Sequence, residues 1–227
     1  MDRGEAGKKI TKQRLVEIML VAMVFTGAFV LLFDVIPFEY SMLKTIACES
    51  LIFLLVAFPS LLAYKYQGGS LNNLKGFKVK EIGIIFGLLV FRALLAFVLD
   101  LAGIQNIGMA KIWNPIMPFV YLVYYVFVVA VCEEFIFRIY IQETFERLLG
   151  NRRVLAPVCA GLLFGAFHLI AGDMTNAIVS AFLGIIWGYV RYAGTSFMAM
   201  VMIHGLSNYL LYVMALIMGF RYGIYLM

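Results

Sequence analysis

Residues 81–103 read EIGIIFGLLVFRALLAFVLDLAG, and this stretch decides the fold class of the chain. A helix that crosses the hydrocarbon core of a bilayer needs about 20 predominantly apolar residues. The stretch has that length, and its charges are confined to Glu81, Arg92 and Asp100. It therefore predicts one membrane-spanning helix.

Comparable apolar runs recur on both sides of this stretch. The chain is 64% hydrophobic and only 14% charged, which lies outside the range of ordinary soluble domains. We therefore predict an all-α, polytopic membrane bundle that forms a single transmembrane domain over residues 1–227. Its seven predicted spans lie near residues 15–36, 42–64, 81–103, 116–140, 154–172, 174–192 and 196–218, and a broken piece within 104–115 would make eight.

The distribution of Lys and Arg predicts the orientation of the bundle. Basic residues gather in 1–14, in the loop 65–80 and after the fourth and sixth spans, whereas the opposite loops carry only Lys44, Lys111 and Arg221. By the positive-inside rule the N-terminus is cytoplasmic, and residues 1–14 form a basic tail before an uncleaved first span. The net charge of +5 is thus a topology signal, and its scatter over several loops argues against a nucleic-acid partner.

Ionisable side chains inside predicted spans are costly in lipid, so those that occur usually face the bundle interior and have a function. Between Glu49 and Arg92 we expect an interhelical ion pair. The segment VCEEFIFR, residues 131–138, places three more charges in an apolar run. Positions four apart share a helix face, whereas adjacent ones point about 100° apart. Glu134 can therefore pair with Arg138, which leaves Glu133 without a partner and favours it for chemistry.

The chain contains two histidines, His168 and His204, each in its own predicted span. Phe164 lies one turn before His168, and Asn208 lies one turn after His204. A single histidine in a membrane is commonly an interhelical hydrogen-bonding residue. Two histidines, a carboxylate and an amide on separate helices are, together, the groups needed to activate a water and stabilise an oxyanion.

Small residues in the same half of the chain predict close helix packing. Gly161 and Gly165 form one small-xxx-small pair, and Gly184 and Gly188 form another, while Pro157 suits the first turn of the His168 helix. The cysteines have no paired spacing. We expect them to pack as small apolar side chains, in preference to a thiol nucleophile at Cys132.

Three motifs carry a resemblance to a known family. EExxxR is present as Glu133, Glu134 and Arg138, FxxxH as Phe164 and His168, and HxxxN as His204 and Asn208. Their order on three separate spans resembles the CAAX protease and bacteriocin-processing (CPBP, or Abi) family, which includes the type II CAAX prenyl endopeptidases. The resemblance covers a motif-bearing core at residues 115–215.

The resemblance implies an intramembrane endopeptidase, usually classed as a metalloendopeptidase. It implies that Glu133 and His168 polarise a water, that His204 and Asn208 form the oxyanion site, and that Glu134, Arg138 and Phe164 support the geometry. A bound Zn²⁺ stays open: Glu133, His168 and His204 supply the minimal three-ligand set, yet the chain has no HExxH. The residues favour a water activated by glutamate and histidine without an obligatory metal.

The resemblance also implies the partners, which are the lipid bilayer and a membrane-associated peptide or protein. That substrate is either a prenylated CAAX-type tail or a bacteriocin-like peptide. The compact loops favour a multi-pass protein of a prokaryotic cell membrane. Two alternatives stay open at this point, a small proton-coupled transporter and a catalytically silent immunity or scaffold protein.

The predicted spans place Glu133 and His168 at different depths in the membrane. At a rise of 1.5 Å per residue, the offset is about 10–15 Å. It disappears if the fourth span continues as a long helix past Arg138 and the fifth begins at Pro157. We therefore predict that long helix, with the side chains of Glu133 and His168 within about 8 Å of each other.

Overall fold

The structure is a computed structural model. It describes residues 11–12, 14, 16–17, 42–70, 74, 76–104, 116–171 and 174–221. Most of the basic tail, of the first predicted span and of the region 104–115 therefore lies outside the described residues. The side chains of Cys48 and Glu49 lie outside them too.

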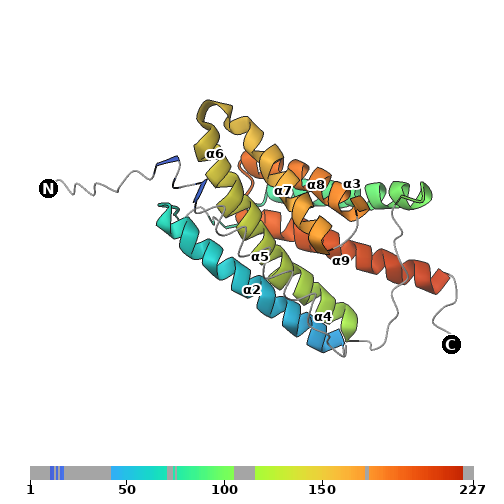
Figure 1. The fold of residues 1–227 in the computed structure, drawn as a ribbon. Coiled ribbons are helices and arrows are strands. Elements are labelled where there is room, and N and C mark those ends of the chain that lie inside the picture. Colours follow the sequence, from blue (N-terminus) through green and yellow to red (C-terminus); the bar gives the residue numbers. More distant parts are fainter. Residues whose placement is uncertain are drawn as a thin grey trace.

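The described residues fold into helices and contain no strand, which confirms the predicted all-α class (Figure 1). In chain order the elements are α2 (Met42–Tyr66), α3 (Glu81–Leu101), α4 (Met117–Val123), η2 (Tyr124–Val129), α5 (Ala130–Glu134), η3 (Phe135–Gln142), α6 (Glu143–Leu149), η4 (Gly150–Leu155), α7 (Ala156–Ala171), α8 (Met174–Tyr192) and α9 (Phe197–Arg221). Among the described residues, three helical stretches are long and apolar enough to cross a membrane: Glu81–Leu101, Pro118–Leu169 and Phe197–Ile217. The predicted count of seven or eight spans is not confirmed.

One long helical run, from α4 to α6, forms the axis of the molecule. It passes through two π-helical segments, η2 and η3, and ends at Gly150, whose φ of 54° lies in the left-handed region that favours glycine. After the 3-10 turn η4, α7 begins at Ala156 with Pro157 in its first turn. The prediction of a long helix past Arg138, followed by a helix that starts near Pro157, is therefore confirmed.

Glycines bring α7 and α8 into close contact. A Cβ added at Gly165 would lie 2.5 Å from the Cβ of Ala181, and one at Gly161 would lie 2.5 Å from the backbone nitrogen of Ile185. Real Cβ atoms do not approach other atoms this closely, so only glycine fits at either position. The predicted small-xxx-small packing is confirmed, and it fixes α7, which carries His168, against α8.

The start of α9 is held by a buried carboxylate from α3. Glu81 accepts hydrogen bonds from the backbone nitrogen and the hydroxyl of Ser196, at 2.7 and 2.6 Å. Ser196 in turn caps α9 by accepting a hydrogen bond from the backbone nitrogen of Ala199 at 3.2 Å. The N-terminus of the helix that carries His204 is therefore tied to the N-terminus of α3.

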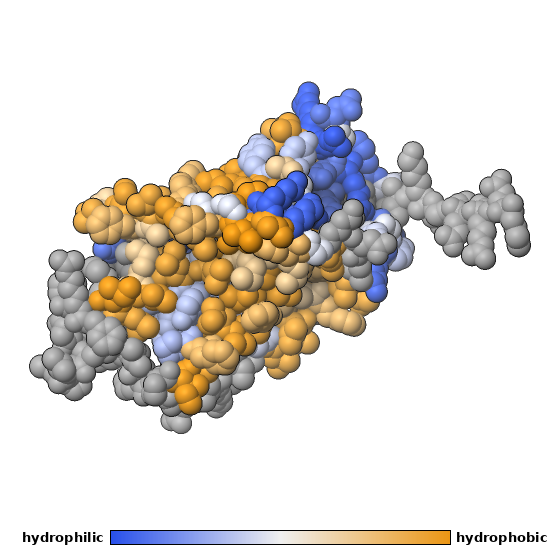
Figure 2. Space-filling model, turned by 180° about the vertical axis from the view of Figure 1, so that it is seen from behind, coloured by the Kyte–Doolittle hydropathy of each residue, from blue (hydrophilic) through white to orange (hydrophobic). Residues whose placement is uncertain are grey.

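Large apolar side chains cover much of the outer surface (Figure 2). Leu54, Phe58, Phe86, Phe97 and Phe119 are all more than half exposed. Hydrophilic residues gather at one end of the same view. Apolar faces of this extent mark a surface that contacts something other than water, and for helices of this length the bilayer is that medium. The protein is thus an integral membrane protein.

Arg92 lies on α3 with 4% of its surface exposed. Its expected partner, Glu49, has a side chain outside the described residues, so the ion pair between them stays a prediction.

Candidate active site

Both glutamates of the EE pair contact one imidazole. His204 Nε2 lies 3.2 Å from Glu133 Oε2, and His204 Nδ1 lies 2.8 Å from Glu134 Oε1. The expectation that Glu133 has no partner is therefore wrong. Successive α-helical side chains diverge, but a ring with a nitrogen on each side can meet both carboxylates at once. The π-helical segments on either side of α5 change the local helical register, which a fixed 100° step does not describe.

Arg138 completes this group from the next turn of the long helix. Its Nε lies 3.3 Å from Glu134 Oε2, and the two side chains are 0% and 1% exposed, which confirms the predicted pair. We call Glu133, Glu134, Arg138 and His204 the buried ion cluster. With both glutamates ionised and with Arg138 and His204 protonated, its charges sum to zero. Such neutrality is needed because an unpaired charge in an apolar interior is strongly unfavourable.

The geometry constrains the protons of His204. Carboxylate oxygens only accept hydrogen bonds, so each ring nitrogen that faces an ionised glutamate must donate. His204 Nδ1 hydrogen-bonds with Glu134 Oε1 at 2.8 Å, and Nε2 lies 3.2 Å from Glu133 Oε2, so that a protonated ring lies between two carboxylates. A positively charged ring at this point can stabilise a developing oxyanion.

Exposure separates the members of the buried ion cluster. Glu133 has a side chain that is 13% exposed, whereas the other three are at most 2% exposed. A water molecule or a substrate can therefore approach Glu133, while the remaining groups lie behind it. Glu133 is thus the most accessible member of the buried ion cluster.

Aromatic rings hold His204 from two sides. The Trp187 ring lies 4.7 Å from it at an interplanar angle of 37°, and the Phe164 ring meets it edge-on at 5.8 Å. Phe164 also carries the Arg138 guanidinium 5.5 Å from its ring centroid. Sequence reasoning did not single out Trp187. Its signal was a large aromatic residue directly before Gly188, in the small-xxx-small pair that brings α8 close to α7.

His168 faces Phe164 from the other side. Its Nδ1 lies 2.9 Å from the carbonyl oxygen of Phe164, one turn back on α7. Since a carbonyl only accepts, Nδ1 carries the proton, and in the neutral ring Nε2 is the acceptor. A neutral imidazole with a free Nε2 is suited to accept a proton from a water.

The structure brings the two histidines near each other without a direct bond. The Phe164 ring lies 4.4 Å from the His168 ring and 5.8 Å from the His204 ring, so the two imidazoles are at most about 10 Å apart. Between the described residues, no hydrogen bond or ion pair joins His168 to Glu133. The predicted separation of under about 8 Å between the side chains of Glu133 and His168 stays a prediction.

Asn208 lies one turn beyond His204 on α9, and its side chain is partly buried. Within the part of the chain that the structure describes, it makes no hydrogen bond, so its amide can serve a ligand. The neighbouring Gly205 explains how α9 reaches the long helix. A Cβ there would lie 2.6 Å from the Cα of Val126 in η2, and only a glycine permits that approach.

The donor set does not fit the three-ligand zinc site that was left open. Among the described residues, no group of three or more His, Cys, Asp and Glu is arranged to hold a metal ion. His204 Nδ1 is engaged by Glu134, its Nε2 lies 3.2 Å from Glu133 Oε2, and His168 does not join these two residues in a three-ligand arrangement. Cys132 is buried, as expected for a packing role.

Residues 115–210 match the family model described as type II CAAX prenyl endopeptidase Rce1-like. This range contains all three motifs and every residue of the buried ion cluster. No curated protein and no solved structure matches the chain. The family match agrees with the resemblance carried by the three motifs and supports membership: over residues 115–210 the chain is similar to the Rce1-like type II CAAX prenyl endopeptidases.

Proposed function

We propose that this protein is an intramembrane endopeptidase that hydrolyses a peptide bond in a membrane-associated substrate with a water activated by Glu133 and His168. One observation carries the proposal above the others: Glu133 is the accessible edge of an otherwise buried cluster of ionisable side chains. The similarity to the family over residues 115–210 supports CAAX-protease activity. The geometry supports the roles proposed below for the individual residues.

In the first step, a water lies between Glu133 and the free Nε2 of His168. Glu133 takes one proton from it as the general base, and the oxygen of the water bonds to the scissile carbonyl carbon. The carbonyl π electrons move onto its oxygen, which becomes an oxyanion. His204 Nε2–H and the Asn208 amide then donate hydrogen bonds to this oxyanion.

Protonation of Glu133 also frees His204 for this task. In the resting arrangement, His204 Nε2 lies 3.2 Å from Glu133 Oε2. Once that carboxylate is neutral, its attraction for the imidazolium falls while the negative charge on the substrate oxygen grows. When the tetrahedral intermediate collapses, the C–N bond breaks and Glu133 returns the proton to the leaving amine.

Glu134 and Arg138 act as positioning residues. Glu134 uses one oxygen for His204 Nδ1 and the other for Arg138, so it fixes the ring orientation from the side away from the substrate. No step of this mechanism passes through a metal ion. The substrate class that follows is a peptide anchored at the membrane, either a prenylated CAAX-type tail or a bacteriocin-like peptide.

The test is cleavage of a farnesylated CAAX reporter peptide by purified protein in nanodiscs. The wild type, Glu133→Gln and Glu17→Gln are compared, with products identified by mass spectrometry. Glu17 is an exposed residue far from the buried ion cluster in the sequence, and it serves as the matched control. We expect cleavage by the wild type and the control but none by Glu133→Gln. A wild type that cleaves neither this reporter nor a panel of membrane-anchored peptides would contradict the proposal.

A further inference from the structure

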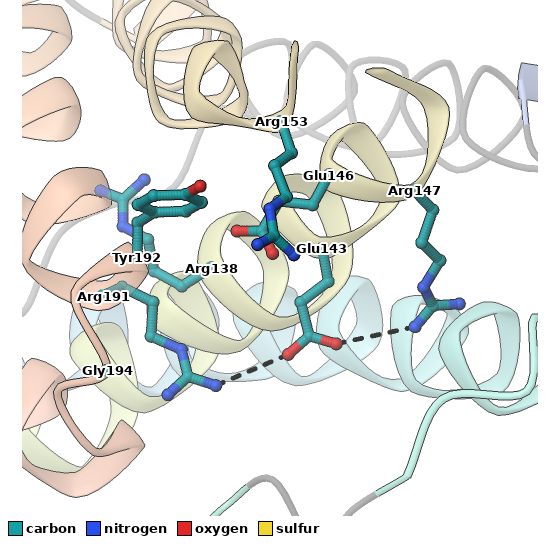
Figure 3. A pocket seen from close by; sticks show the side chains of 8 residues that line it. All are labelled: Arg138, Glu143, Glu146, Arg147, Arg153, Arg191, Tyr192 and Gly194. Atoms are coloured by element: carbon teal, nitrogen blue, oxygen red, sulfur yellow. Dashed lines mark ion pairs between the residues drawn. The ribbon is translucent and has the colours of Figure 1, made fainter. Parts of the chain in front are cut away.

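A cavity of about 660 Å³ lies at the polar end of the molecule, where η4 connects the long helical run to α7. Its charged lining residues are Arg138, Arg147, Arg153, Arg191, Glu143 and Glu146 (Figure 3). We call it the arginine cavity. Four cations and two carboxylates line it, so the lining has a net positive charge and favours an anionic ligand. Its volume lies in the range of small-ligand pockets, about 300–1,000 Å³, and leaves room for more than a single inorganic anion.

The two carboxylates of the lining are engaged by other residues. Glu143 lies 3.6 Å from Arg147 and 3.5 Å from Arg191, and Figure 3 shows it between these two arginines. Glu146 accepts a hydrogen bond from the Gln142 amide at 3.1 Å. Among the described residues, neither glutamate forms an ion pair with the remaining two arginines of the lining.

Those two arginines, Arg138 and Arg153, keep donors that no described residue satisfies. Arg138 is fully buried, and its terminal nitrogens Nη1 and Nη2 have no hydrogen-bond acceptor in the described part of the chain. Arg153 is exposed on η4 and forms no ion pair with any described residue. The guanidinium fork matches the oxygens of a phosphate. A tetrahedral phosphate also accepts hydrogen bonds from several directions, which suits arginines that come from four different elements.

The surroundings of the arginine cavity indicate the boundary between lipid and water. Val154 and Leu155, which directly follow Arg153, are 49% and 45% exposed. Tyr192 lines the cavity, and Tyr189 lies one turn before it on α8, and both rings are more than a third exposed. Tyrosine is enriched at membrane–water interfaces. A charged cavity with exposed apolar side chains beside it fits a ligand that has a polar head and an apolar body.

We propose that the arginine cavity binds a phosphate group, and that an anionic phospholipid of the surrounding bilayer supplies it. The headgroup enters the cavity, and the acyl chains lie against Val154 and Leu155. Basic pockets beside membrane helices bind lipid headgroups in this way. A choline or ethanolamine headgroup would bring a cation to a positive lining, so an anionic headgroup binds more tightly. The inference goes beyond the proposed function, because it concerns lipid binding and does not depend on peptide cleavage.

The test follows the Tm of the purified protein in a neutral detergent during titration with short-chain phosphatidylglycerol. A ligand that binds the folded state raises Tm as its concentration rises, so the titration gives an apparent Kd. Parallel titrations use short-chain phosphatidylcholine, whose phosphate carries a choline cation, and glycerol 3-phosphate, which has no acyl chains. The wild type is compared with Arg153→Gln, Arg153→Lys and Arg152→Gln. Arg152 is an exposed neighbour that does not line the cavity, and it is the matched control.

We expect a saturable rise in the Tm of the wild type with phosphatidylglycerol and a higher Kd for phosphatidylcholine. In Arg153→Gln the Kd for phosphatidylglycerol should rise about tenfold, because a charge-assisted hydrogen bond is lost. It should rise less in Arg153→Lys, which keeps the charge but loses the fork, and stay unchanged in Arg152→Gln. A Kd that Arg153→Gln leaves unchanged would overturn the inference. Equal weakening in Arg152→Gln would overturn it too, because general surface charge would then account for the binding.

The titration with glycerol 3-phosphate separates a lipid from a soluble source of the phosphate. A shift with phosphatidylglycerol and none with glycerol 3-phosphate supports the phospholipid. An equal or lower Kd for glycerol 3-phosphate that depends on Arg153 would support the phosphate site and overturn the phospholipid as its source. The Tm of each variant without ligand reports its folding, and Arg153→Lys serves as the test variant if Arg153→Gln does not fold. Because no titration involves cleavage, a failure of this inference is observed separately from a failure of the proposed function.

Discussion

His204 connects the elements of the site, because both of its nitrogens and both of its sides are in contact with other residues. Its ring faces Trp187 at 4.7 Å, an arrangement in which the indole π face stabilises a cation. We predict that Trp187→Leu lowers kcat about tenfold with little change in KM, since a cation–π contact is worth about 1–2 kcal/mol. Phe182→Leu is the control, because Phe182 lies on the same helix but is half exposed. An unchanged kcat in Trp187→Leu would contradict this role.

Substitutions of Arg138 and Glu134 test the charge balance of the buried ion cluster. Arg138→Met leaves Glu134 without its cation, and breaking a buried pair in this way costs about 3–5 kcal/mol. We predict a large drop in Tm in detergent for Arg138→Met, and a partial recovery of Tm in the double variant Arg138→Met with Glu134→Gln. If the double variant instead lost as much Tm as Arg138→Met and Glu134→Gln together, the pairing would be contradicted.

Much of the candidate site could be predicted from the sequence. The pair of Glu134 with Arg138 and the contact of Phe164 with His168 both follow from the four-residue spacing of a helix. The contact of Glu133 with His204 does not, because it depends on where α9 lies against α5. The spacing of residues within one helix does not predict which side chains of another helix contact them.

Glycine at the interface of α7 and α8 is the element-scale feature most open to test. A Cβ at Gly165 would lie 2.5 Å from Ala181 Cβ and 2.6 Å from the backbone oxygen of Ala177, neither of which can rotate away. We predict that Gly165→Ala lowers Tm and activity together, because α7 moves and His168 moves with it. Gly83→Ala in α3 is the matched control, since a Cβ there meets nothing within 4 Å, and it should leave both unchanged or raise Tm. A lower Tm and a lower activity in both Gly165→Ala and Gly83→Ala would contradict this role of Gly165 in helix packing.

The helices themselves were predictable from apolar length, and the long helix through Arg138 was predictable from the need to bring Glu133 and His168 to one depth. The π-helical segments η2 and η3 were not, because a shift in backbone hydrogen-bond register leaves no mark on composition or hydropathy. They flank the pair Glu133 and Glu134, and π-helical turns are frequent at functional sites.

The whole molecule presents an apolar surface around a small polar interior, so its chemistry depends on charges that balance internally. Among the described residues no three His, Cys, Asp or Glu side chains are arranged to hold a metal ion, and the proposed mechanism uses none. We predict that dialysis against EDTA changes kcat/KM by less than about twofold, within the variation expected for such an assay. A loss of activity that added Zn²⁺ restores would contradict it.

The central claim is that Glu133 is the general base that activates the water. The most direct measurement is the single-turnover rate of reporter cleavage for the wild type and for Glu133→Gln, both in nanodiscs and with folding checked by Tm. Loss of a general base lowers the rate by about 10²–10⁴-fold, and we predict a loss in that range for Glu133→Gln in a variant that still folds. A variant that cleaves within about threefold of the wild-type rate would contradict the assignment of Glu133.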